Sequence, residues 1–367
     1  MNRLCGNTYG RYLMILATLV AGYSVSGAAM TSMTDLGGGA RAVSGGWSAI
    51  FGNGGGICNG TLNATISGWW TMNGVTFTVG PGGVINTQVD TSSSGQGEIN
   101  FGGGATLIID GGTVNSNNRR NNDSTSNGCY IGDSGNAPNN YALLRLENGG
   151  VFNSTYQYVR FGTNNGKIGR LSVNDGVMNI RNGGREFILC YAASTAIVNA
   201  TNFTLVASAL RLCENAAALV QSEMVDSDIT VQRVYKTKEQ NDGSFFRFDG
   251  TVFHTATAGV DFFGPLTVPY ELVGNGLAID TAHDVSASGT FSGPGPFKKR
   301  GAATFTFAGT YLGTGDLVLE SGTFNFGATA FFDQAVRLVA ADNTTIRAPL
   351  TEDGIWCILS KYFGFPP

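Results

Sequence analysis

Residues 144–153 read LRLENGGVFN: apolar and charged residues alternate, a double glycine follows, and a second short apolar pattern ends in asparagine. The alternation places Leu144 and Leu146 on one face of a strand and the charged residues on the other. Two architectures fit this local pattern, a hairpin with a tight turn at Asn148 and Gly149, or one coil of a repeated structure. The spacing of similar stretches along the chain distinguishes them.

The same motif, a glycine followed by two apolar or β-branched residues and an asparagine, recurs along the chain. Its asparagines are Asn86, Asn115, Asn153, Asn179 and Asn325, and a degenerate copy, AIVN, ends at Asn199. From Asn86 to Asn199 the intervals are between about 20 and 40 residues, the length of a solenoid coil, whereas a sandwich or meander turns about every 8 to 12 residues. The longest of these intervals includes residues 115–140, a polar stretch that we expect to loop out of its coil.

Stacked coils explain why asparagine and glycine recur at these positions. In a parallel β-solenoid the coils lie about 4.8 Å apart, so equivalent side chains stack along the axis. Glycine adopts positive φ without steric cost, and asparagine tolerates left-handed backbone angles while its amide can bond to the next amide in the stack. We therefore predict an all-β parallel solenoid with a ladder at its turns, formed by Asn86, Asn115, Asn153, Asn179 and Asn325.

The composition favours the same fold class and argues against two other classes of protein. The chain of 367 residues contains 54 glycines and is 13% charged, which suits short strands joined by glycine turns better than amphipathic helices. A hydrophobic content of 42% and a net charge of -4 are not those of a disordered chain. We expect no nucleic-acid partner, because no basic excess is present to displace phosphate counterions.

The N-terminus has the layout of a secretory signal peptide. Arg3 and Arg11 precede an apolar run over residues 12–20, and small residues lead to a cleavage site near Ala28. The apolar run is too short to span a bilayer comfortably, and a retained anchor is the alternative interpretation. We therefore predict a signal peptide at residues 1–28 and a mature protein that is secreted or on the cell surface, with no membrane span.

The cysteines argue against a zinc site. Cys5 lies in the signal peptide, which leaves an odd number of cysteines and no C-x-x-C motif, so we predict neither a metal site nor a full disulfide framework. Cys190 and Cys213 are separated by about one coil, and stacking would bring their Cα atoms within the roughly 4.4–6.8 Å that a disulfide spans. A bridge or two buried thiols both fit this spacing.

The stretch GPFKKRGAATFTFAGTYLGTGDLVLESGTFNFG, which starts at Gly295, resembles the autotransporter-associated β-strand repeat. The positions that match the repeat are Lys299, Gly301, Thr304, Thr306, Tyr311, Gly313, Gly322 and Thr323. The sequence departs from the repeat where Phe305, Phe307 and Phe324 replace the usual leucines and Ala303 replaces a common glycine. The resemblance implies an exported passenger-type domain built as a single-stranded right-handed parallel β-helix.

The chain divides into five predicted segments. These are a signal peptide (1–28), an N-terminal cap region (29–70), a β-helix solenoid (71–292), the autotransporter-associated repeat (293–327) and a C-terminal coil or truncated end (328–367). Aromatic residues of the cap region, Trp47, Phe51, Trp69 and Trp70, are expected to close the solenoid or to form a carbohydrate-stacking platform. Residues 207–250 allow a short helix, but the returning strand alternation favours coils. No translocator barrel is recognisable, as in a secreted relative or a truncated reading frame.

Few residues form a pattern that indicates chemistry. Asp175, Arg181, Arg185 and Glu186 lie within about one coil and are the candidate binding residues, although outward strand positions are polar in any solenoid. Two histidines, His254 and His283, have no carboxylate pattern around them, and two aspartates, Asp226 and Asp228, are too few for a calcium site. We predict no catalytic residue, no metal and no cofactor.

Two functions from different classes fit these observations. The first is an exported structural or adhesive protein, secreted or on the cell surface and without catalytic activity, whose partner is an extracellular glycan or another surface molecule. The alternative is a carbohydrate-active enzyme, a polysaccharide lyase or glycoside hydrolase, on the same scaffold. Scarcity of clustered charge favours the first, because glycoside hydrolysis needs two convergent carboxylates.

Overall fold

In the computed structural model, the described residues form 33 β-strands and no helix. The structure describes residues 31–33, 40–43, 56–66, 70–89, 99–117, 128–132, 141–155, 158–180, 184–333 and 336–348. The predicted signal peptide at 1–28 lies outside these residues, as do Trp47, Phe51 and Trp69 of the predicted cap region.

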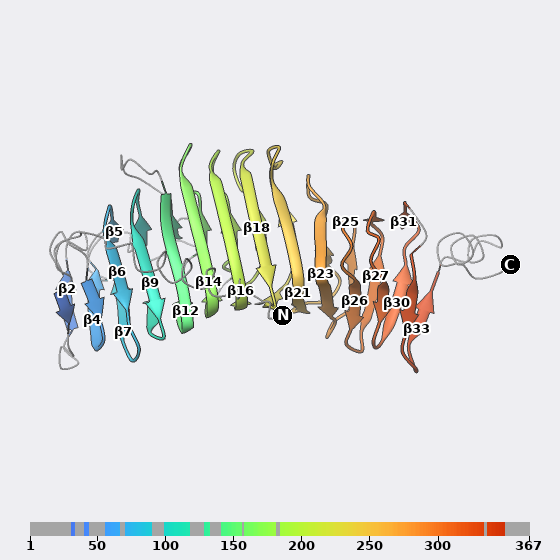
Figure 1. The fold of residues 1–367 in the computed structure, drawn as a ribbon, viewed down its shortest axis with the longest axis horizontal. Coiled ribbons are helices and arrows are strands. Elements are labelled where there is room, and N and C mark those ends of the chain that lie inside the picture. Colours follow the sequence, from blue (N-terminus) through green and yellow to red (C-terminus); the bar gives the residue numbers. More distant parts are fainter. Residues whose placement is uncertain are drawn as a thin grey trace, which may run out of the picture.

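The strands belong to two sheets, and each sheet runs along the length of the molecule (Figure 1). The first sheet has 21 strands: β1 (Thr31–Met33), β2 (Ala40–Val43), β3 (Gly56–Cys58), β4 (Thr61–Ile66), β6 (Thr76–Val79), β7 (Val84–Val89), β9 (Thr106–Asp110), β10 (Thr113–Asn117), β12 (Tyr141–Ser154), β14 (Ile168–Ile180), β16 (Thr195–Val206), β18 (Leu219–Val225), β19 (Asp228–Val231), β21 (Phe245–Thr255), β23 (Tyr270–Asp280), β25 (Thr290–Ser292), β26 (Phe297–Arg300), β28 (Thr310–Tyr311), β29 (Leu317–Leu319), β31 (Phe331–Phe332) and β32 (Leu338–Ala340). The second sheet has 12 strands: β5 (Trp70–Met72), β8 (Ile99–Phe101), β11 (Gly128–Ile131), β13 (Tyr158–Phe161), β15 (Phe187–Leu189), β17 (Leu210–Leu212), β20 (Val234–Lys236), β22 (Asp261–Phe263), β24 (Val285–Ala287), β27 (Thr304–Phe307), β30 (Thr323–Phe326) and β33 (Thr345–Arg347).

The molecule is a parallel β-solenoid, as the sequence predicts. The chain advances steadily from one end of the molecule to the other, and strands of successive coils pair in parallel (Figure 1). The hairpin interpretation of LRLENGGVFN is wrong, because β12 continues through Asn148 and Gly149 and pairs in parallel with β9, β10 and β14. Both turn residues have positive φ, 54° and 75°, which bends the strand without reversing it.

The register of the paired strands stacks apolar side chains on one another from coil to coil. An inward-facing column of the first sheet contains Leu62, Ile85, Val114, Phe152, Met178, Leu205, Ile229, Phe253 and Ile279. All are fully or almost fully buried, and full burial of one such side chain contributes about 1.5–3 kcal/mol. Burial of this repeated column explains why the strands keep the same register although the coils differ in length.

The bends in the long strands carry the left-handed backbone angles. Asp175 in β14 and Asn202 in β16 occupy these bends with φ of 65° and 52°, and Asp226 occupies the turn between β18 and β19 with φ of 46°. The ladder asparagines are not at the turns, where the sequence placed them, but at outward-facing positions later in the strands. The reason is that a flat strand keeps equivalent side chains in register, whereas a bend needs residues that tolerate positive φ.

Parallel stacking extends beyond the segment from 71 to 292. Within the predicted cap region, β3 and β4 pair in parallel with β6 and β7. At the other end, β31, β32 and β33 add strands to both sheets beyond residue 327. Residues 207–250 contain strands and no helix, in agreement with the interpretation as coils.

Of the two states that the spacing of Cys190 and Cys213 allows, the structure shows two buried thiols that are adjacent in the stack and not bridged. Cys190 and Cys213 are both buried free thiols, with φ of 67° and 52°. Their thiols donate to backbone carbonyls instead, Cys190 Sγ to Leu219 at 3.3 Å and Cys213 Sγ to Ala218 at 3.8 Å. Burial raises the pKa of both thiols, Cys213 to about 11, so neither is a reactive thiolate at neutral pH.

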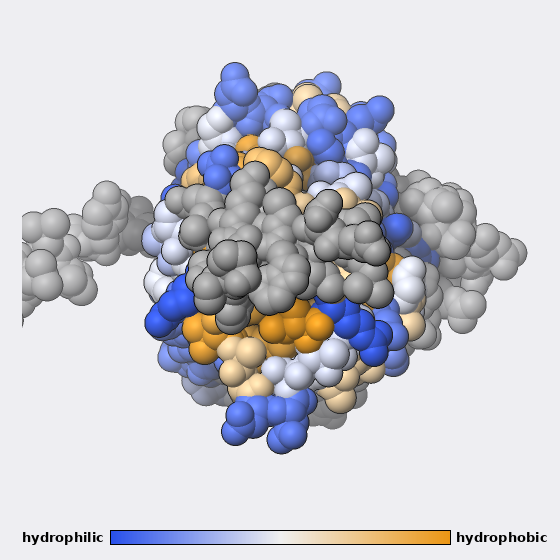
Figure 2. Space-filling model, turned by 90° about the vertical axis from the view of Figure 1, so that its right-hand side faces the viewer, coloured by the Kyte–Doolittle hydropathy of each residue, from blue (hydrophilic) through white to orange (hydrophobic). Residues whose placement is uncertain are grey.

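The core changes from aliphatic to aromatic toward the C-terminal end. In the later coils Phe253 packs edge-on against Phe263 at 5.2 Å between ring centroids, and Tyr270 stacks on Phe291 at 5.0 Å. At the end itself, Ile346 continues an inward column but is 38% exposed. Figure 2 looks onto this end and shows hydrophobic residues inside a hydrophilic rim.

Candidate functional site

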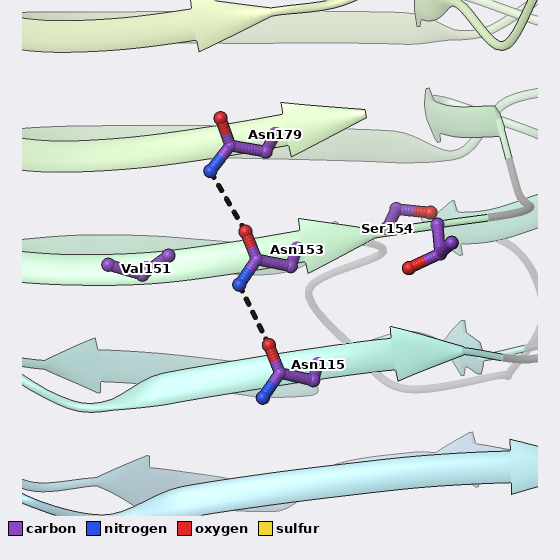
Figure 3. A pocket seen from close by; sticks show the side chains of 6 residues that line it. Asn115, Val151, Asn153, Ser154 and Asn179 are labelled. Atoms are coloured by element: carbon purple, nitrogen blue, oxygen red, sulfur yellow. Dashed lines mark hydrogen bonds between the residues drawn. The ribbon is translucent and has the colours of Figure 1, made fainter. Parts of the chain in front are cut away.

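A ladder of asparagine amides follows the first sheet. Asn115 donates from Nδ2 to Asn86 Oδ1 at 2.8 Å. Asn153 donates in the same way to Asn115 at 2.7 Å, and Asn179 to Asn153 at 2.9 Å (Figure 3). These bonds point in one direction along the solenoid, and such chains of amides polarise and strengthen one another. Beside the ladder lies an open groove of about 400 Å³, which Val151 and Ser154 also line.

Two asparagines differ from the ladder that the sequence predicts. Asn63 extends the ladder, because Asn86 Nδ2 donates to its Oδ1 at 2.8 Å. Its motif, GTLN at residues 60–63, follows the same pattern as the others and was the signal that could have found it. Asn325 does not belong to the ladder: it lies on β30 of the second sheet and donates to Thr306 at 3.2 Å. The local motif recurs at Asn325, but this residue is on a strand of the second sheet and therefore does not stack on the ladder asparagines.

The four candidate binding residues do not form one site. Asp175 is exposed at the bend of β14, on the first sheet. Arg185 and Glu186 lie together just before β15, on the second sheet. Arg181 lies outside the described residues. Only Arg185 and Glu186 therefore share a surface, and the structure surrounds them with residues that the sequence did not single out.

That surface, which we call the Tyr–Arg face, lies on the outer side of the second sheet. It comprises Tyr130, Tyr158, Arg160, Arg185, Glu186, Tyr191, Arg211, Glu214, Arg233 and Tyr235. These residues come from β11, β13, β15, β17 and β20 or from the turns beside them. Five stacked strands extend over about 19 Å at a spacing of about 4.8 Å, so the face is an elongated strip along the axis.

Arg160 lies at the centre of the aromatic part of the face. Its guanidinium carbon lies 5.3, 4.8 and 4.5 Å from the ring centroids of Tyr130, Tyr158 and Tyr191. Its Nη1 also donates to the Tyr130 hydroxyl at 2.9 Å. The side chain is only 3% exposed, so these cation–π contacts act in a largely desolvated setting, where each is worth up to about 2 kcal/mol.

Two carboxylates converge on Arg211. Its Nη2 lies 2.7 Å from Glu186 Oε2 and 3.1 Å from Glu214 Oε1, and Glu186 Oε1 accepts a hydrogen bond from Tyr235 at 3.0 Å. Burial raises the pKa of the Glu214 carboxyl, against the lowering effect of the Arg160 and Arg211 guanidiniums. Glu214 was not among the predicted site residues, because it lies a coil away from Glu186 in the sequence.

Several polar atoms of the face have hydrogen-bonding capacity left. Among the described residues, the buried atoms without a hydrogen-bond partner include Nε of Arg160, Nε of Arg211, and Oε2 of both Glu186 and Glu214. The 2.7 Å contact of Arg211 with Glu186 Oε2 is thus an ion pair without the alignment of a hydrogen bond. Native structures leave few such atoms, so this concentration distinguishes the face from the rest of the solenoid.

The histidine and aspartate candidates form ordinary surface contacts. His254 lies between two carboxylates, with Nδ1 3.2 Å from Asp280 Oδ2 and Nε2 3.3 Å from Asp228 Oδ1. Asp226 occupies a bend of the chain instead of pairing with Asp228. In the described part of the chain, no group of three or more histidine, cysteine or carboxylate side chains is placed to hold a metal ion.

Comparison with protein-family models and with curated proteins finds no match for this chain. The resemblance of the stretch from Gly295 to the autotransporter-associated repeat therefore stays a prediction. Nor do the residues that the structure describes include a helix of the length and apolar character needed to cross a bilayer.

Proposed function

We propose that this protein is an exported structural or adhesive protein that binds an extracellular partner through the Tyr–Arg face and does not transform it. Export is supported by the predicted signal peptide at residues 1–28 and by the resemblance of the later coils to autotransporter passengers. The two continuous sheets supply a rigid support, on which the binding surface is preorganised.

The observation that carries the proposal is the combination of charge and rings on one face. Four guanidiniums, those of Arg160, Arg185, Arg211 and Arg233, lie among four tyrosines and two carboxylates. Arginine and tyrosine are the residues that dominate binding energy at interfaces, because they offer large rigid contact area together with donors. The asparagine ladder lacks such residues and is better explained as a stabilising element of the stack.

The arrangement of the carboxylates supports binding without turnover. Glu186 and Glu214 both contact Arg211, and Glu214 also lies 3.6 Å from Arg160 Nε. Their side chains are only 13% and 16% exposed. A general acid or nucleophile must reach the glycosidic bond, and a carboxylate held between guanidiniums is poorly placed to do so.

The proposal is tested on cells that express the full chain and on the purified protein. Protease or an impermeant label applied to intact cells should reach the chain, unless it is recovered from the medium. The purified protein should then bind cell-surface material and release no soluble sugar from it. Confinement to the cytoplasm, or binding unaffected by Tyr158→Ala and Arg233→Ala together, would contradict the proposal.

The alternative function, a carbohydrate-active enzyme, is favoured by one observation. Glu186 and Glu214 lie close to a common guanidinium, and burial raises the pKa of the Glu214 carboxyl. Glycoside hydrolysis uses two carboxyl groups, one of which acts as a general acid with a raised pKa. Release of reducing ends from a glycan by the wild type, and its loss in Glu214→Gln, would establish this alternative.

A further inference from the structure

The Tyr–Arg face has more arginines than carboxylates, whereas the charged stack around Arg247 on the first sheet has more carboxylates than arginines. On the first sheet, Arg247 lies between two carboxylates, 3.7 Å from Glu223 Oε1 and 3.0 Å from Glu271 Oε2. That stack alternates in sign and contains one arginine and two carboxylates. On the Tyr–Arg face, the described residues include four guanidiniums and two carboxylates, which leaves an excess of two positive charges on a chain with a net charge of -4.

Arg233 is the accessible cation of this face. It is exposed, and its guanidinium carbon lies 4.1 Å from the centroid of the Tyr235 ring. No ion pair of Arg233 occurs among the described residues. A cation–π contact uses no N–H···O hydrogen bond, so the guanidinium can still donate to a planar acceptor such as a carboxylate.

We propose that the ligand of the Tyr–Arg face is a linear acidic polysaccharide, a chain of uronate sugars, that lies along the solenoid axis. This proposal rests on the function proposed above and names its ligand class. The half-exposed side chains of Tyr158 and Tyr191 offer apolar contact to the sugars, while Arg233 offers donors to their carboxylates. The elongated strip matches an extended polymer better than a compact ligand.

The balance of charges favours a polyuronate over a nucleic acid. A nucleic acid carries a charge on every phosphate, and the net negative protein would repel it beyond the short cationic strip. An excess of two positive charges suits a ligand that presents few carboxylates to the strip at once.

The test compares two forms of one polymer. Binding of the full chain to polygalacturonate and to fully methyl-esterified polygalacturonate is measured by calorimetry, with a single-stranded oligonucleotide as a third ligand. We expect the acidic form to bind at least about tenfold more tightly than the ester, since a charge-assisted hydrogen bond contributes about 1.5–3 kcal/mol. Equal binding of ester and acid, preference for the oligonucleotide, or no binding would overturn the inference.

Matched variants assign the binding to this face. Arg233→Gln should weaken polygalacturonate binding about tenfold, through loss of one charge-assisted contact. Arg247→Gln, which removes the arginine from the alternating stack of the first sheet, should change polygalacturonate binding less than about twofold. Equal effects of the two variants would overturn the assignment. Cleavage of the polymer would contradict the proposed function and leave the ligand class intact. Tight binding of the ester that is lost in Arg233→Gln would contradict the ligand class and leave the proposed function intact.

Discussion

One outward-facing column of the first sheet has two different regions. In order along the solenoid it contains Asn63, Asn86, Asn115, Asn153, Asn179, Val206, Thr230, His254, Asp280 and Arg300. The first region repeats one residue, whereas the last alternates in charge and ends with Arg300 Nε 2.7 Å from Glu320 Oε2. The difference teaches that a polar residue can repeat at a stacked position when its side chain can hydrogen-bond to an identical side chain in the next coil.

The reason lies in the short distance between coils. Stacked side chains are about 4.8 Å apart, where like charges repel and a donor needs an acceptor. An asparagine amide both donates and accepts, so any number of them can stack. A charged residue must instead be followed by its opposite, as in the column that contains Glu223, Arg247 and Glu271. The same rule thus produces an amide ladder in one region and an alternating one in another.

The largest expected effect comes from an inward charge in the alternating region. Lys299 continues the buried column beside Arg300, and its Nζ donates to the carbonyls of Arg300, Gly301 and Ser321 at 2.8, 2.5 and 3.0 Å. Lys299→Met would leave these carbonyls without their donor and should lower the free energy of unfolding by about 3 kcal/mol. Urea denaturation measures this loss, and an unchanged midpoint in Lys299→Met would show that the lysine does not stabilise these carbonyls.

The pH dependence of stability tests the same lysine. Burial lowers the pKa of Lys299 to about 8 in the folded chain, from an ordinary value of 10.5. Between these values the unfolded chain binds more protons, so the contribution of Lys299 to stability rises with pH from about 8 upward. Buried thiols and tyrosines titrate alike in both proteins, so the difference between wild type and Lys299→Met isolates the lysine. A difference that shrinks from pH 7 to 9.5 would contradict the assignment.

Breaking the amide ladder at its centre should have the next largest effect. Asn115→Asp removes the donor to Asn86 and introduces a charge, and we expect a loss of about 2 kcal/mol in the free energy of unfolding at pH 7. Asn179→Asp, at the end of the ladder below Val206, should cost about 1 kcal/mol. Equal losses in the two variants would show that the ladder is not cooperative.

Reversing a charge in the alternating region should have a smaller effect, because these side chains are about 40% exposed. Arg300→Glu places three carboxylates in a row, with Asp280 and Glu320 on either side, and should cost about 1 kcal/mol. The loss should diminish in 1 M salt, since screening weakens repulsion between exposed charges. Arg300→Lys is the control and should retain most of the stability; a salt-independent loss would point to packing instead.

The smallest effect is expected for the asparagine that shares the motif but not the ladder. Asn325 has one 3.2 Å bond to Thr306, so Asn325→Ala should change the free energy of unfolding by about 0.5 kcal/mol. The comparison with Asn115→Ala separates the motif from the stack. A loss as large as that at Asn115 would show that the local motif, and not the register, determines the contribution.

The sequence predicts the repeating part of this molecule well and the candidate site poorly, for one physical reason. The same motif recurs in several coils, so the period, the parallel stacking and most of the ladder can be predicted from the sequence. The Tyr–Arg face has no repeat: Arg160, Arg211 and Tyr235 come from separate coils joined by turns of unequal length. Which residues meet there depends on register, and the motif at Asn325 shows that a local pattern does not determine register.

The unequal coils have a practical consequence for engineering. Thirty-eight residues separate Asn115 from Asn153 and 23 separate Asn63 from Asn86, yet the amides bond at 2.7 and 2.8 Å in the two cases. The spacing along the axis is therefore independent of how much chain leaves and re-enters a coil. Foreign peptides inserted at a corner would be carried without disturbing the rows beneath them, and several could be displayed side by side at a fixed pitch.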